Sequence, residues 1–279
     1  MKVELESILQ ETQKLPALPQ VITEILQKID DPETTPEIFQ QVITKDPFIT
    51  AKTLKLANSA FYGYSREIST ISNAVVILGM DTLRSMIIAM SAYNLLNKEV
   101  KGYNYQRDDY WKHSLSTAII TRKIAQLREY QNLEICFISG LLHDIGKLLL
   151  DRFRYIYLES IEEFSRKNKV PDYLAEKAII GYNHSDAGAY LANVWKFPQV
   201  LTDVINYHHW PLKVNNLNSI YIKVVHVADC MSNIYLKGSS NPVNKIVERE
   251  IGVTDQEKEK IIAETTLEMD QFTQELRKE

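Results

Sequence analysis

The chain has 279 residues, 45% hydrophobic and 24% charged, which allows one large domain or two of ordinary size around a substantial core. Its net charge of −4 provides no excess of positive charge for binding nucleic acid or an anionic membrane, so we expect neither among its partners. Only 9 Gly and 9 Pro occur, and few runs alternate between apolar and polar residues, so the composition predicts an all-α fold.

Three further features predict a cytoplasmic protein. No run approaches the roughly 18 uninterrupted apolar residues of a membrane span, and the first 20 residues carry acids where a signal peptide has a long apolar centre. Cys136 and Cys230 each stand alone in apolar surroundings, without CxxC spacing. We therefore expect two reduced cysteines in the core and a reducing compartment.

Residues 1–100 form the first of three regions that differ in composition, and helix signals recur along them. One helix is expected to begin at Thr35, before a proline, and to end at Asp46, before another. Residues 72–96 predict a short apolar helix and then a longer one, separated near Gly79 and with Asp81 as the N-cap of the second.

Residues 101–237 form the second region, which follows a polar join. Its first helix is amphipathic, and Asp108 or Asp109 is its expected cap. Residues 238–279 begin with a linker, GSSNP, and continue into a charged helix over 254–276. The apolar positions of this last helix could pack on the body of the protein or on a partner.

The stretch GLLHDIGKLLL, residues 140–150, places three polar side chains in an otherwise apolar run, where each is costly to bury without a partner. His143 and Asp144 diverge by about 100° on a helix, so one ion could sit in the wedge between them. Lys147 lies on the same helix face as His143, where its ammonium could hold a phosphate oxygen. The alternative is a helix end with one hydrogen-bonded histidine and a surface ion pair.

All six histidines lie after residue 112, and each has a simple structural alternative when taken alone. His113 fits a buried position in an amphipathic helix, and His184 fits a loop next to a cap formed by Asn183 or Ser185. The pair His208–His209 stands at a helix end, marked by the Pro that follows Trp210.

Asp229 lies inside the apolar helical segment VVHVADCM, where an ionised carboxylate needs a partner. No Lys or Arg stands three or four residues away. His226, one turn earlier, is either the hydrogen-bond partner of Asp229 or a core residue.

Together these residues predict a metal site in a helical bundle. Imidazole and carboxylate ligands suit Fe, Zn, Mn or Ni rather than Ca. One ion would need His113, His143, Asp144 and Asp229. A second could use Asp144 as a bridge, with His184, His208 and His209. Such a pair would hold a phosphoryl group and activate water for hydrolysis.

The order H…HD…H…HH…D resembles that of the HD superfamily of metal-dependent phosphohydrolases. Four segments narrow the resemblance to the HDOD family of bacterial signalling domains: DPFITAKTLKLANSAFYG, ILGMDTLRSMI, GLLHDIGKLLL and HSDAGAYLANVWKFP…INYHH. This resemblance covers most of residues 13–235. It implies an N-terminal helical bundle, residues 1–100, packed on an HD-like helical core, residues 101–237.

The resemblance also bears on function. HDOD domains are regarded as signal-transduction output modules without established catalysis, which implies a signalling protein partner or a small nucleotide ligand. The related phosphodiesterases of cyclic di-GMP carry Gly-Tyr-Pro soon after the paired histidines, whereas this chain reads HHWPLKVNN. Hydrolysis of cyclic di-GMP is therefore not expected.

Two hypotheses follow for function. The first is an HDOD output module that retains one or two Fe, Mn or Zn ions and acts by binding rather than turnover. The second is a metal-dependent phosphohydrolase that acts on a nucleotide or cyclic nucleotide. In the second, Asp144 and Lys147 are catalytic, with Lys147 stabilising the developing phosphate charge.

Overall fold

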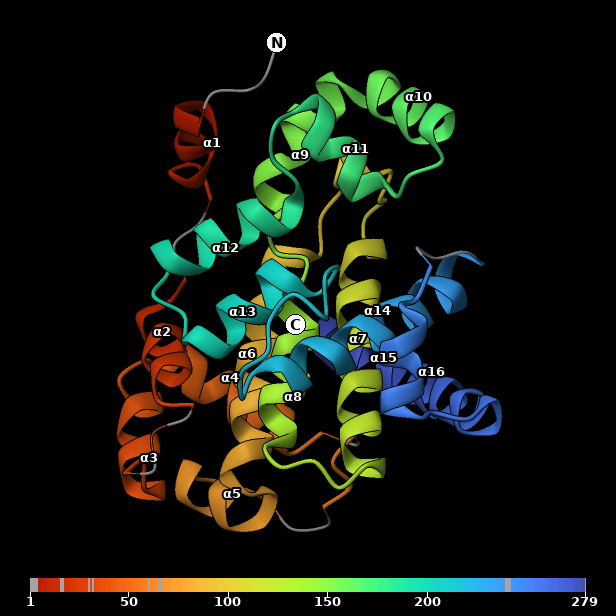
Figure 1. The fold of residues 1–279 in the computed structure, drawn as a ribbon. Helices are drawn as coiled ribbons and strands as arrows, with labels where there is room; N and C mark the ends of the chain where they lie inside the picture. Colours follow the sequence, from red (N-terminus) through yellow and green to blue (C-terminus); the bar gives the residue numbers. More distant parts are fainter. Residues whose placement is uncertain are drawn as a thin grey trace.

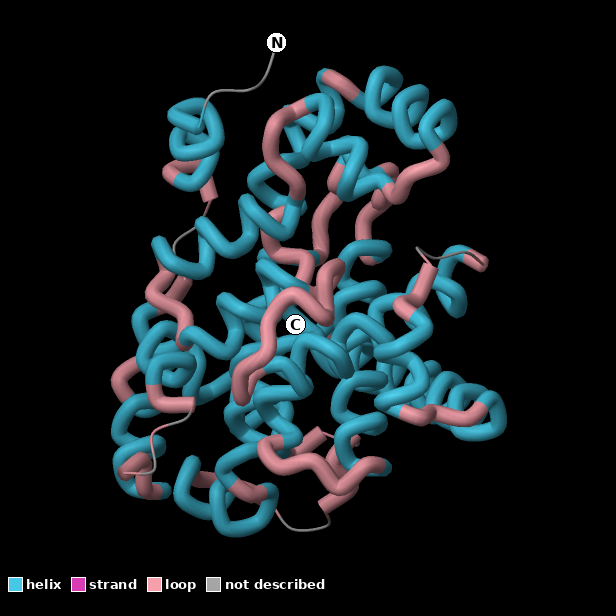
Figure 2. The backbone as a smooth tube through the Cα atoms, in the orientation of Figure 1, coloured by secondary structure: helices cyan, strands magenta, loops and turns pink. Residues whose placement is uncertain are grey.

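The computed structural model of the chain describes residues 5–15, 18–29, 31, 33–59, 61–64, 67–238 and 242–278. All regular structure in these ranges is helical, apart from one isolated antiparallel bridge between Val100 and Tyr105. Figures 1 and 2 show this arrangement of helices and loops. The all-α prediction is thereby confirmed.

The N-terminal helices are short until the last of them. They are α1 (Leu5–Thr12), α2 (Gln20–Gln27), α3 (Pro36–Thr44), α4 (Pro47–Ala57), α5 (Ile71–Leu78) and α6 (Met80–Leu96).

The next helices run from a single 3₁₀ turn to the long α14. They are η1 (Lys101–Tyr103), α7 (Asp109–Leu127), α8 (Leu133–Leu142), α9 (Lys147–Ile156), α10 (Leu158–Asn168), α11 (Asp172–Ile179), α12 (His184–Val194), α13 (Gln199–Tyr207) and α14 (Ser219–Lys237). The C-terminal helices are α15 (Lys245–Ile251) and α16 (Asp255–Arg277).

Side-chain caps begin α3, α4 and α5. Thr35 caps α3 by accepting from the backbone N–H of Ile38, directly before a proline as predicted. Asp46, predicted only as the end of that helix, also caps α4. Gly79, at φ 84°, separates α5 from α6. The prediction that Asp81 is the N-cap of α6 is wrong, because the helix already begins at Met80 and no side chain caps it.

Helices α7, α8 and α14 form the centre of the molecule, with α2 and α3 on one side and α15 and α16 on the other (Figure 1). A single apolar cluster extends from α2 through α6 and α8 to α16. The division at residue 100 into an N-terminal part and a core therefore remains a prediction, since no break in packing marks it.

The C-terminal helix α16 packs against the body of the protein, mainly on α7. Phe272 and Met269 are buried, and the indole N–H of Trp111 donates to Thr273 Oγ1 at 2.9 Å. Leu267 remains 66% exposed. Of the two alternatives for this helix, packing on the body is the one observed.

In the described parts of the chain, no single helix is long and apolar enough to cross a membrane. Helices α5 and α6 have the length and apolar composition of a span only together, and a bend of 114° separates them.

Candidate metal centre

Five helices bring the predicted ligand residues to one place. Two of these residues lie within helices, one begins a helix, and four lie at or just after helix ends. They are His113 in α7, Asp229 in α14, His184 at the start of α12, His143 and Asp144 after α8, and His208 and His209 after α13. All are buried except His209, which is half-buried.

The turn between α8 and α9 is what brings α12 close. A Cβ on Gly146 would lie 1.9 Å from the carbonyl oxygen of His184, so only glycine permits this approach. Because residues 143–146 form a turn, Lys147 begins a new helix rather than continuing that of His143. The prediction that these two residues share one helix face is therefore wrong.

One set of ligand atoms gathers around Asp144 Oδ2 and Asp229 Oδ1. Nε2 of His113 lies 3.2 Å from Asp144 Oδ2 and 3.3 Å from Asp229 Oδ1. Nε2 of His143 lies 3.4 Å and 3.6 Å from the same two oxygens. These are the four residues predicted for a single ion, and two imidazoles with two carboxylates suit Fe, Mn or Zn.

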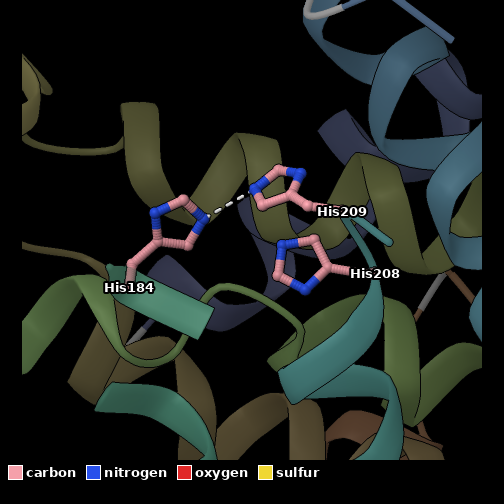
Figure 3. Close-up of side chains that lie close together, drawn as sticks. All are labelled: His184, His208 and His209. Atoms are coloured by element: carbon pink, nitrogen blue, oxygen red, sulfur yellow. Dashed lines mark hydrogen bonds between the residues drawn. The ribbon is translucent and has the colours of Figure 1, made fainter. Parts of the chain in front are cut away.

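A second set gathers around the other oxygen of Asp144. Nε2 of His184 lies 3.3 Å from Asp144 Oδ1, and Nε2 of His208 lies 3.7 Å from it. His209 Nε2 lies 2.8 Å from His184 Nε2, and Figure 3 shows the three rings grouped together. The two oxygens of Asp144 thus face different histidines, which is the arrangement that a bridging carboxylate needs.

The donor atoms fit a cation. Nδ1 of His143 donates to Gly140 O at 2.8 Å, and Nδ1 of His208 donates to Ile205 O at 2.9 Å, so Nε2 is the nitrogen that each ring would offer to a bound ion. Nε2 of His113, His143 and His208 is buried without any hydrogen-bond partner. Buried polar atoms rarely lack a partner. One divalent ion in the first set would satisfy His113 and His143, and a second ion would satisfy His208.

The pKa shifts agree with this fit. Burial alone would raise the pKa of Asp144, but His143 and Lys147 hold it well below its usual range, so the carboxylate is ionised. Burial, reinforced by His143, lowers the pKa of His208 to about 3, so this ring is neutral. Burial opposes charge on His143 too, yet Asp144 and Asp229 raise its pKa to about 10. A bound metal would replace that proton.

The partner of Asp229 is not His226. Asn233 Nδ2 donates to Asp229 Oδ1 at 2.7 Å. Nδ1 of His226 donates to His208 O at 2.8 Å, and its Nε2 accepts from the backbone N–H of Asn244 at 2.9 Å. Both ring nitrogens are engaged, so His226 is a structural residue that ties the turn at His208 to α14.

A cavity of about 280 Å³ opens onto this centre. Asp144, Asp229 and His184 reach its wall, as does Lys147, whose ammonium bonds Asp144 Oδ2. A small molecule in the cavity would therefore contact the bridging carboxylate and the lysine predicted beside it.

The family model of the HDOD domain matches residues 15–211. The chain belongs to the HDOD family. Among solved structures it is similar to an HDOD domain protein of unknown function from Geobacter sulfurreducens, with 26% identity, a TM-score of 0.70 and 99% of each chain covered. It is also similar to a candidate phosphohydrolase from Shewanella amazonensis SB2B, with 26% identity, a TM-score of 0.69, and 97% and 98% covered.

Two curated relatives are longer proteins. An uncharacterized protein of Treponema pallidum (strain Nichols) is 25% identical over 204 residues, which are 73% of this chain and 39% of that protein. Ribonuclease Y of Mycoplasmoides gallisepticum is 29% identical over 187 residues, 63% of this chain and 28% of that protein. The chain thus spans well under half the length of either relative.

One important residue of this HDOD centre was not predicted from the sequence. Glu176 of α11 is fully buried, and its Oε2 accepts from the backbone N–H of His184 at 3.0 Å and from His184 Nδ1 at 2.8 Å. Arg154 Nε donates to Oε1 of Glu176 at 3.1 Å. Glu176 fixes which nitrogen of His184 faces the centre. Its only sequence signal is an acid within LAEKAII.

Proposed function

We propose that this HDOD chain is a cytoplasmic signal-transduction output module that holds one or two divalent ions, Fe, Mn or Zn, in the centre described above. It acts by binding a signalling protein or a small nucleotide rather than by turnover. The observation that carries the proposal is the convergence of three buried, unpartnered imidazole nitrogens on Asp144 and Asp229. The buried cysteines Cys136 and Cys230 are reduced in this proposal.

The segment after the paired histidines supports binding over hydrolysis of cyclic di-GMP. His209 stacks on Tyr173 with ring centroids 4.1 Å apart, and Trp210 meets the same tyrosine edge-on at 5.1 Å. The Gly-Tyr-Pro signature of the related cyclic di-GMP phosphodiesterases is absent from this segment. The proposed ligand is accordingly a small nucleotide other than cyclic di-GMP.

Phosphohydrolase activity is the second candidate, and the position of Lys147 favours it. When bound, a divalent ion supplies a Lewis acid that activates water. Lys147 lines the cavity beside Asp144, where its ammonium would neutralise charge that develops on a phosphoryl group. Asp144 would orient the reacting groups through its two oxygens.

One experiment separates the two candidates. The metal-loaded full chain is screened against mononucleotides, cyclic nucleotides and phosphomonoesters by thermal shift, and product is measured in the same samples. Asp144→Asn is the test variant, and Asp203→Asn, a buried carboxylate bonded to amide side chains outside the centre, is its control. We expect a nucleotide that raises the melting temperature and is recovered intact.

Product formed by the wild type and by the Asp203 variant, but not by the Asp144 variant, would establish the phosphohydrolase instead. An affinity purification with the full chain tests the other alternative, binding of a signalling protein. No nucleotide binding together with no specific protein partner would contradict the proposed module.

A further inference from the structure

The cavity at the metal centre has a second lysine that neither hypothesis uses. Lys237, the last residue of α14, lines the cavity together with Asp229 and Asn233 of the same helix. These residues are spaced four apart, so they lie on one face of α14 and lead from the buried carboxylate towards the rim. Asn233 donates a hydrogen bond to Asp229. Lys237 is the only cation among these three residues.

Two ammonium groups converge on one buried ring. Lys237 Nζ lies 4.0 Å from the centroid of the Tyr105 ring, and Lys147 Nζ lies 5.3 Å from it and 3.5 Å from the Tyr105 hydroxyl. Tyr105 is only 2% exposed and comes from the segment before α7. The ring therefore holds both lysines at the cavity by cation–π contact.

The two lysines differ in their counter-ions. Lys147 is paired with Asp144. Lys237 makes no ion pair with any carboxylate in the parts of the chain that the structure describes; its contact there is the Tyr105 ring. Burial, and next the like charge of Lys147, lower the pKa of Lys237 to about 8. Like charges held together without a shared anion repel, and an anion between them removes that cost.

Binding of an anion between Lys147 and Lys237 would depend on a metal ion, because of the other charges around the cavity. Four carboxylates and three cations line the wall, so the chain by itself offers no excess of positive charge. A divalent ion reverses that balance, and it would also compete with Lys147 for Asp144. Lys147 would then lack a counter-ion, as Lys237 does, and one anion could pair with both ammonium groups.

We propose that Lys147 and Lys237 form a clamp for the phosphate group of the ligand, with Tyr105 as its base. The inference rests on the proposed function, since the clamp takes an anion only beside a loaded metal centre. It narrows the ligand to small phosphate-bearing compounds, in keeping with a cavity of about 280 Å³. A tetrahedral anion suits two ammonium groups because each offers several donors around a point charge.

The test is calorimetric titration of inorganic phosphate into the manganese-loaded full chain, with metal content measured on the same samples. Lys237→Gln is expected to weaken phosphate binding about tenfold, the loss of one charge-assisted contact. Lys237→Arg should stay within about threefold of wild type. Lys260→Gln is the matched control, because this exposed lysine lies on α16 outside the cavity.

The possible outcomes distinguish failure of the phosphate clamp from failure of the proposed function. Metal-loaded wild type that binds no phosphate, or Lys237→Gln that binds it as well as wild type, would overturn the clamp and leave the metal centre standing. A chain that takes up no manganese would overturn both. AMP and adenosine as second probes show whether the phosphate, rather than the base, carries the affinity.

Discussion

Helices α2–α6 and helices α7–α14 bury different kinds of side chain. In the first group the core is aliphatic and aromatic, and its buried polar residues on the described helices are only Thr53, Arg84 and Ser85. In the second group the centre of the molecule contains histidines, carboxylates and hydroxyl groups. Burial of such groups costs free energy unless they are partnered, so the second group carries costly polar side chains that a binding site explains.

The difference lies in how the polar groups are partnered. Arg84 and Glu134 meet where α6 packs on α8, with Nη1 and Oε2 3.8 Å apart. Arg84 Nε and Glu134 Oε1 also lack hydrogen bonds, so the difference lies in convergence: around Asp144, three imidazole nitrogens without hydrogen bonds lie within 3.7 Å of its two carboxylate oxygens. A cluster that points unpartnered lone pairs at one place indicates a ligand, whereas a polar pair at a packing interface indicates structure.

The largest expected effect of a single change on stability is in the apolar group. Leu83→Ala, at a fully buried position of α6, should lower the free energy of unfolding by about 2 to 5 kcal/mol. Metal content per folded chain should stay as in wild type. Denaturant unfolding and elemental analysis check both parts, with Leu217→Ala, at a 94% exposed position, as the matched control. If folded Leu83→Ala lost its metal, the claim that α2–α6 serve packing and α7–α14 serve the site would be contradicted.

The next effect is on metal affinity. Glu176→Gln removes the charge that holds His184 by two hydrogen bonds, and we expect metal binding to weaken about 10- to 100-fold. Competition with a chelator of known affinity measures this change. Asp203→Asn should bind metal like wild type, and an equal loss in both variants would mean that Glu176 has no special role.

The smallest effect concerns Glu134, at the contact between the two groups. Burial, and next the charge of Asp81, raise the pKa of Glu134 from 4.5 to about 10. The folded state therefore holds a proton that the unfolded state releases, and the associated stability is complete below pH 4.5 and is lost as the pH rises towards 10. Glu134→Gln should thus gain stability relative to wild type as the pH rises through this range.

Thermal unfolding of wild type and Glu134→Gln at about pH 6, 7 and 8, near the middle of that range, provides the comparison. The gap in stability should widen as the pH rises. A gap that stays constant would show that the carboxyl group is ionised in the fold and paired with Arg84.

The sequence was most informative where a local pattern has one physical meaning. The helix start at Thr35 follows from residue type and spacing, and the structure has it. Of the two caps that the sequence offered, Asn183 and Ser185, the structure has Asn183. The failures have local causes as well. Gly79, with its positive φ, ended α5 and let α6 begin before Asp81, and the turn at 143–146 interrupted a helix that periodicity alone would continue.

The ligand residues of the candidate centre could be predicted because histidines and aspartates are rare in apolar runs. The contacts that depend on long-range packing could not be predicted. Glu176 reaches His184 only because α11 folds back on α12, and Lys237 meets Lys147 only over the ring of Tyr105. Acids and lysines are common on helix surfaces, so nothing in their local sequence separates these two from solvated neighbours.

The central claim is that the histidines and aspartates around Asp144 hold metal. Elemental analysis of the untagged protein, wild type beside His143→Ala/Asp144→Ala, tests it most directly. We predict one or two Fe, Mn or Zn ions per chain in the wild type and none in the folded double variant. A wild-type chain that stays free of metal after reconstitution with all three would contradict the account and leave the cluster as a hydrogen-bonded core.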